Sequence, residues 1–131
     1  MFRGVLLKLR EGDDDSMTAV WFDVDLDEYR KLKPGWDSYR ARVPNDYSID
    51  AAKDVLRVLK AHDIEPTHVA ASVIGGVGIT IRQSKKRLVF IESQNHGRTY
   101  IVLGNGEDCD VAPITIAEPD GWINRIREHL K

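Results

Sequence analysis

The sequence predicts a two-layer α+β domain, in which two helices cover one face of an antiparallel sheet. Residues 49–59 carry apolar side chains at helical spacing, and the apolar stripe of residues 122–130 repeats that spacing. Between them, residues 67–103 hold four short runs with the composition and alternation of strands, separated by turn sequences. A meander between two amphipathic helices buries these stripes most simply.

The first 26 residues predict a β-hairpin. An apolar run from Phe2 to Leu9 and a period-two run from Thr18 to Val24 flank the acidic, turn-rich segment 11–16. A chain of 131 residues has the usual length of one domain. We therefore expect a single domain over residues 1–131, with a hairpin extension (1–26) and an α+β body (27–131).

The body begins with a polar stretch, residues 27–33, that can form one helical turn before Pro34 and Gly35 end it. We expect Ser48 to cap the first long helix. The apolar face of this helix predicts its core residues, and Pro66 stops it at or before residue 65. Those residues are Ile49, Ala52, Val55, Leu56 and Leu59.

Four strands are predicted next, joined by short turns rich in glycine and polar residues. A fifth run, residues 111–117, contains Pro113 and is therefore expected at a sheet edge, because proline cannot donate to a strand ladder. Asp120 is the predicted cap of the last helix, whose apolar stripe includes Trp122 and Ile126. The four strands are expected at Thr67–Val73, Val77–Arg82, Leu88–Ser93 and Thr99–Leu103.

Composition points to a soluble, cytoplasmic chain. Cys109 is the one cysteine, so no intrachain disulfide can form, and no apolar run approaches the length of a membrane span. Residues 1–28 hold eight acidic and three basic residues, and the remainder is mildly basic. Nucleic acid is an unexpected partner, because binding it usually needs a concentrated basic face.

No motif for catalysis, metal or cofactor is present, and we predict none of the three. The acidic run 23–28 lacks the glycine and final glutamate of a calcium loop. Gly75-Gly76-Val77-Gly78 precedes a strand, whereas a phosphate-binding loop precedes a helix, so a hairpin turn explains it. The basic residues 85–87 are interpreted as a solvated hairpin end.

The most distinctive segment runs from Gly35 to Pro44 and predicts an interaction loop. Tryptophan, tyrosine and arginine are the side chains that most often carry interface energy. The alternative is structural: a loop that packs its aromatic residues on its own core, with an aspartate closing an Asx turn. The candidate binding residues are Trp36, Asp37, Tyr39, Arg40 and Arg42.

This segment also resembles a group of small, uncharacterised bacterial α+β proteins. Their signature is Gly/Asn-Trp-Asp-x-x-x-Ala-x-Pro, followed by a helix and an antiparallel meander containing Gly-Gly. Here Gly35-Trp36-Asp37, Ala41 and Gly75-Gly76 match, while the proline is displaced to Pro44. The resemblance covers about residues 35–118. It implies an association with mobile-element or toxin–antitoxin-like genes, and no activity or cofactor.

The predicted function is that of a small non-enzymatic interaction or accessory protein, such as an antitoxin-like, inhibitor or phage factor. The partner is expected to be another protein, and the apolar N-terminal hairpin suggests a homodimer. The alternative is a small enzyme or ligand-binding domain, and nucleic-acid binding is a weaker one. The enzyme's site would assemble from dispersed polar residues such as Asp37, His62, His68, Glu92 and His96.

Overall fold

The fold was analysed in a computed structural model, which describes residues 26–36, 42–72, 74–84 and 86–131. The predicted N-terminal hairpin lies outside these residues. The described chain contains one short 3-10 helix, two α-helices and five strands. They are η2 (Leu26–Lys31), α1 (Asp46–Ala61), β1 (His68–Ser72), β2 (Gly76–Ser84), β3 (Arg87–Gln94), β4 (Thr99–Gly104), β5 (Cys109–Ile114) and α2 (Pro119–His129).

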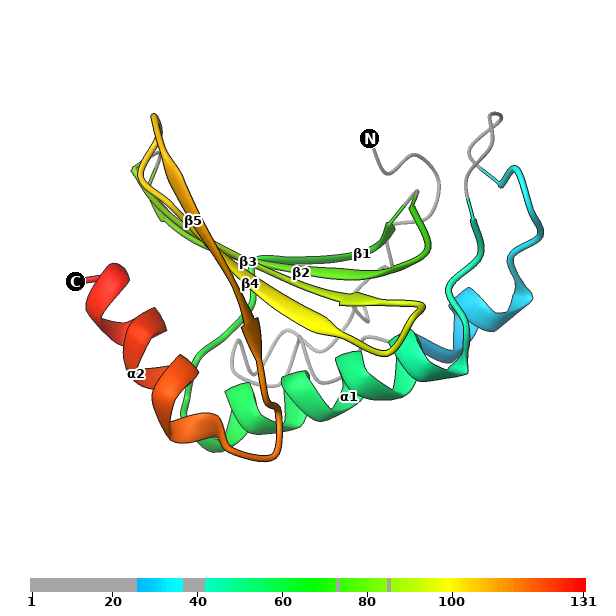
Figure 1. Ribbon diagram of the computed structural model, residues 1–131, viewed down its shortest axis with the longest axis horizontal. Helices are drawn as coiled ribbons and strands as arrows, with labels where there is room; N and C mark the ends of the chain where they lie inside the picture. Colours follow the sequence, from blue (N-terminus) through cyan, green and yellow to red (C-terminus); the bar gives the residue numbers. More distant parts are fainter. Residues whose placement is uncertain (1–25, 37–41, 73, 85) are drawn as a thin grey trace, which may run out of the picture.

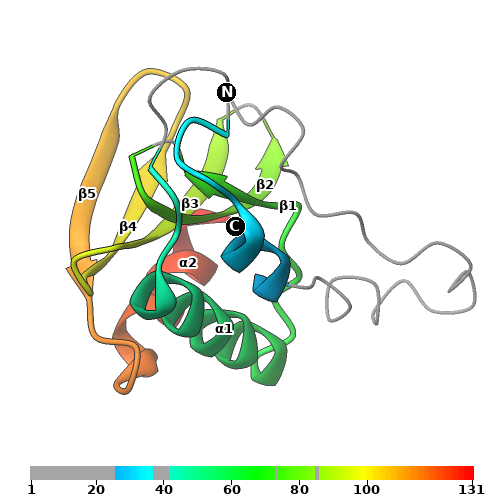
Figure 2. The ribbon, with the colours of Figure 1, turned by 90° about the vertical axis from the view of Figure 1, so that its right-hand side faces the viewer.

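The five strands form one antiparallel sheet in the order β1-β2-β3-β4-β5, so every strand pairs with its neighbour in sequence. Figures 1 and 2 show both α-helices beneath the same face of this curved sheet. The predicted two-layer α+β architecture is therefore confirmed for the described residues. The fifth strand is an edge strand, as Pro113 predicts, although it starts earlier, at Cys109.

The core lies between the sheet and the two helices. Val77, Ile79 and Ile81 point into it from β2, as their alternation predicts. From α1, Val55 and Leu59 are fully buried, whereas Leu56 is only half-buried at the margin of the core. The prediction that Leu56 is a central core residue is therefore wrong: it lies beside the buried stripe.

The start of α1 also differs from the prediction. Asn45, not Ser48, is the capping residue, and its side chain accepts a 3.0 Å hydrogen bond from the backbone N–H of Ser48. The Ser48 hydroxyl in turn accepts from the backbone N–H of Asn45 at 3.1 Å. The two side chains form a reciprocal capping box, in which each accepts from the backbone N–H of the other residue. In α2 the capping position is Glu118 rather than Asp120, and its side chain makes no capping hydrogen bond.

The short helix η2 is joined to α1 by ion pairs. Asp27 contacts Lys53 at 2.7 Å and Arg30 at 3.0 Å, and Arg30 also contacts Asp50 at 3.0 Å. Hydrogen bonds from Lys53 and then Arg30 hold the pKa of Asp27 below its ordinary value of 3.8. Beneath these surface pairs, Leu26 and Tyr29 are buried against the core.

Among the described residues, no helix is long and apolar enough to cross a membrane.

Candidate functional site

The sheet has a second face that neither α1 nor α2 covers in the views of Figures 1 and 2. We call it the helix-free face. Because side chains alternate along each strand, it carries the residues between the core positions. One row crosses the strands in register from Ala70 through Gly78, Glu92 and Tyr100 to Pro113. Glu92 is half-buried near the middle of this row.

A chain of polar side chains starts from Glu92. One carboxylate oxygen accepts a 2.7 Å hydrogen bond from the hydroxyl of Ser72, on β1. The other accepts from the Nε2 amide of Gln94 at 3.0 Å. The carbonyl of Gln94 then contacts Nε2 of His96, in the β3–β4 turn. Ser72, two strands away from Glu92, is thereby connected to the turn at the end of the sheet.

The tautomer of His96 follows from its two contacts. Its Nδ1 accepts the backbone N–H of Arg98 at 3.2 Å, so it carries no proton. The proton lies on Nε2, which donates to the Gln94 carbonyl. Each hydrogen bond in this series of side chains therefore has one donor and one acceptor, and the Glu92 carboxylate accepts two of them. The ring of His96 also meets Tyr100 edge to face, with centroids 6.2 Å apart.

Two glycines on β2 leave the space that the side chains of Glu92 and Phe90 occupy. Gly76 and Gly78 lie on this face of β2, between Ser72 and Glu92. A Cβ on Gly78 would lie 2.7 Å from Cζ of Phe90, so the Phe90 ring covers that glycine. With no side chains on β2 there, the side chain of Glu92 reaches across the strand to β1.

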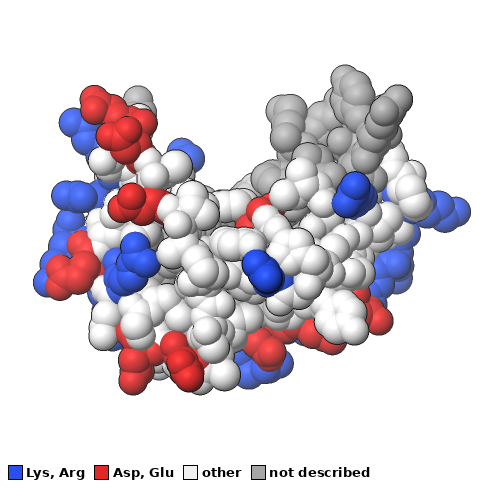
Figure 3. Space-filling model, in the orientation of Figure 1, with Lys and Arg blue, Asp and Glu red and all other residues white. Residues whose placement is uncertain are grey.

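The other half of the helix-free face is apolar. Val102 and Tyr100 of β4 are half-buried, and Val111 on β5 is 62% exposed. Figure 3, which views the molecule from the side of β5, shows mainly uncharged side chains over the middle of the molecule and charged ones at the end with the β4–β5 turn and along the lower edge. Exposed apolar surface beside a half-buried carboxylate is typical of a binding surface.

The loop proposed from sequence is only partly described. Trp36 is half-buried, packs against the core and donates its indole N–H to the carbonyl of Arg42 at 3.0 Å. Arg42 is exposed. Asp37, Tyr39 and Arg40 lie outside the described residues. The two described ends of the loop are thus joined by a hydrogen bond, which is what the structural interpretation of Trp36 requires.

The polar residues that the sequence suggested for an enzyme's site do not all lie together in the described structure. Glu92 and His96 are brought together through Gln94. His62 follows the C-terminal end of α1, where its backbone carbonyl accepts from Arg127, and His68 is the first residue of β1. Sequence reasoning missed Ser72 and Gln94. The available signal was their position, since both alternate with core residues on strands. Alternation along β3 already places Gln94 on the same face as Glu92, two residues away, whereas only the register brings Ser72 to Glu92.

No protein-family model matches the chain, and the searches of curated proteins and of solved structures found no significant match. The resemblance to the bacterial family therefore stays a prediction. Within the described part of the chain, no group of three or more histidine, cysteine, aspartate or glutamate side chains could hold a metal ion.

Proposed function

We propose that this protein is a non-enzymatic interaction protein that binds a protein segment on its helix-free face. The observation that supports this best is the pairing of Glu92 with exposed apolar surface. Glu92 is the one acidic side chain at a strand position of that face in the described chain. Its carboxylate accepts hydrogen bonds from two neutral donors, and no cationic side chain of the described residues lies within 4.0 Å of it, so its charge is available to a ligand.

The expected partner segment carries a lysine or arginine flanked by apolar side chains. The cation would meet Glu92, and two aromatic residues lie on the same face: Tyr100 is the register partner of Glu92 on β4, and Phe90 lies two residues before it on β3. Aromatic rings next to a carboxylate favour a cationic group through both charge and cation–π attraction. Apolar side chains of the partner would cover Val102 and Val111.

Selection from a random peptide library on the immobilised full chain tests the proposal. Recovered peptides should be enriched in basic and apolar residues, and Glu92→Gln should weaken their binding about tenfold, as expected for a charge-assisted contact. Glu107→Gln, which removes an exposed acid at the other end of the sheet, is the matched control. Selected peptides that bind wild type and Glu92→Gln equally would contradict the proposal.

A small enzyme is the second candidate. The observation in its favour is the series of hydrogen-bonded side chains that connects Ser72 to His96. A hydroxyl that donates to a carboxylate resembles an activated nucleophile beside its base. Turnover of ester or phosphoester substrates that is lost in both Ser72→Ala and Glu92→Gln would support it. Wild-type protein that turns over neither class would count against it.

The homodimer through the N-terminal hairpin is part of the same proposal about partners. Light scattering of the full chain at high micromolar concentration tests it directly. A mass of twice 14.8 kDa is expected, and a monomer at that concentration would contradict it.

A further inference from the structure

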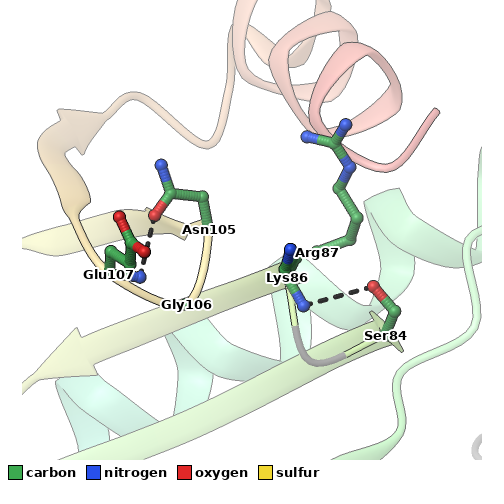
Figure 4. A pocket seen from close by; sticks show the side chains of 6 residues that line it. All are labelled: Ser84, Lys86, Arg87, Asn105, Gly106 and Glu107. Carbon is green, nitrogen blue, oxygen red and sulfur yellow. Dashed lines mark hydrogen bonds between the residues drawn. The ribbon is translucent and has the colours of Figure 1, made fainter.

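Two adjoining hollows lie at the end of the sheet away from His96, and both are lined by Arg87 of β3. The first lies between the β2–β3 hairpin and the β4–β5 turn, and its walls include Ser84, Asn105 and Glu107. The second lies between β3, β4 and α2, and Arg125 and His129 of α2 line it. Figure 4 shows the Arg87 guanidinium extending toward α2, with Asn105 and Glu107 of the β4–β5 turn on the other side of the first hollow.

The second hollow brings together two guanidinium groups without acidic partners. Among the described residues, no carboxylate lies within 4.0 Å of Arg87 or Arg125, whereas Arg30 and Arg57 are both in ion pairs. Glu128, which also lines this hollow, contacts Lys131 at 3.0 Å instead. The second hollow therefore has an excess of positive charge that the fold itself does not neutralise.

The nearby histidine is fixed by the fold. Nε2 of His129 contacts the carbonyl of Gly104 at 2.6 Å, so that nitrogen carries the proton and donates. This bond holds the end of α2 against the end of β4. Arg87 lies on β3, next to β4, and Arg125 lies on α2, so the bond joins the two elements whose side chains line the second hollow.

Besides the cationic side chains of Lys86 and Arg87, the first hollow offers neutral donors and one acidic acceptor. The Oδ1 of Asn105 accepts the backbone N–H groups of Glu107 and Asp108 at 2.9 and 2.8 Å. This leaves its amide NH₂ as a donor toward the hollow. The Ser84 hydroxyl accepts the backbone N–H of Lys86 at 3.2 Å and keeps its own proton to donate. The Glu107 carboxylate, beside Asn105 on the same turn, supplies an acceptor.

We propose that these two hollows bind a small phosphorylated, hydroxyl-bearing molecule, with its phosphate between Arg87 and Arg125. The planar guanidinium group matches phosphate oxygens in a bidentate geometry, and two of them suit a dianion. The hydroxyl groups would lie against Ser84, Asn105 and Glu107. A nucleic acid is disfavoured, because Glu107, Asp108 and Asp110 crowd the same end and would repel a polyanion.

Calorimetric titration of the full chain with glucose 6-phosphate, inorganic phosphate and glucose tests the proposal. Glucose 6-phosphate should bind more tightly than inorganic phosphate, and glucose should not bind. Arg87→Gln and Arg125→Gln should each weaken the binding of both phosphates about tenfold. Both arginines are exposed, so these variants should keep the melting temperature of the unliganded wild type.

Arg98→Gln is the matched control, because Arg98 is an exposed arginine in the turn at the opposite end of the sheet. It should leave both affinities unchanged. Three outcomes would overturn the proposal: no binding of either phosphate up to about 10 mM, unchanged affinity in both arginine variants, or an equal loss in Arg98→Gln. Glucose 6-phosphate that binds no better than phosphate would overturn the assignment of the first hollow to hydroxyl groups.

Discussion

Asn95 connects the β3–β4 turn to the start of α1, and its removal gives the sharpest stability prediction. Its Oδ1 accepts from the backbone N–H of Asn45 at 2.9 Å and from the Ser48 hydroxyl at 2.8 Å. Its Nδ2 donates to the carbonyl of Val43 at 2.8 Å. The side chain is half-buried, so water can replace these three bonds only in part.

The cost of Asn95→Ala follows from these three bonds. A neutral hydrogen bond contributes about 1 kcal/mol net, which sets an upper figure of about 3 kcal/mol. Asn45 and Ser48 keep each other as partners through the capping box, so their losses are partial. We therefore expect Asn95→Ala to lower the free energy of unfolding by about 1.5–3 kcal/mol.

Urea unfolding of the full chain measures this change. The slope of the unfolding free energy against urea concentration should be the same in wild type and variant, which would confirm that the same cooperative unit unfolds. Asn124→Ala is the control, because Asn124 is exposed on α2 and its side chain makes no hydrogen bond with the described residues. Alanine there should change stability by less than about 0.5 kcal/mol. An Asn95→Ala cost below about 0.5 kcal/mol would refute the reasoning, because it would mean that these bonds are not made in solution.

Three further predictions concern the core, the pH dependence of stability and the sheet. Leu59→Ala, at a fully buried position, should cost about 2–5 kcal/mol, and Leu56→Ala, at the margin, clearly less; urea unfolding of both gives the comparison. The pKa of Asp27 is lower in the folded chain than unfolded, so its ion pairs stabilise the fold above the unfolded value of 3.8, and this contribution is lost as the pH falls through the folded pKa. Asp27→Asn should therefore flatten the acid limb of stability against pH, and an NMR titration of the carboxyl should show the lowered pKa directly. Gly76→Ala should cost more than about 2 kcal/mol, because φ is +146° there and a Cβ would lie 2.3 Å from the backbone oxygen of Ser93; unchanged thermal unfolding would contradict this.

The elements that the sequence predicts well are those with a clear period. Val77, Ile79 and Ile81 alternate with small or polar residues, and the period of two leaves one face for the core. The cap of α1 was misplaced because Asn45 and Ser48 both favour capping and stand three residues apart. In a capping box each bonds to the other's backbone, so composition alone does not say which residue lies outside the helix. Leu56 was assigned to the core for a similar reason. It belongs to the apolar stripe of α1, and the sequence does not show that it lies at the edge of that stripe.

The candidate sites depend on contacts that the period of a strand cannot predict. Ser72 and Glu92 meet because β1 and β3 flank a strand that carries glycines on the helix-free face. Arg87 and Arg125 line the same hollow because α2 returns along the sheet and His129 is bonded to Gly104. Each pair depends on the register and on the direction of a returning helix, and these are set by the packing of the whole domain.

The arrangement of the sheet also explains how the two binding surfaces proposed above can both fit on so small a domain. The core needs only one face of the sheet, because α1 and α2 both pack on that face. Glycine on the helix-free face costs backbone entropy and buries no side chain, so Gly78 weakens β2 as a strand. What Gly78 provides is the space that Phe90 fills and that lies on the way from Glu92 to Ser72. Because the Phe90 ring packs over Gly78, this part of the outer face is filled. The outer surface that stays open lies toward Tyr100, Val102 and Val111, which is where we place the proposed partner segment.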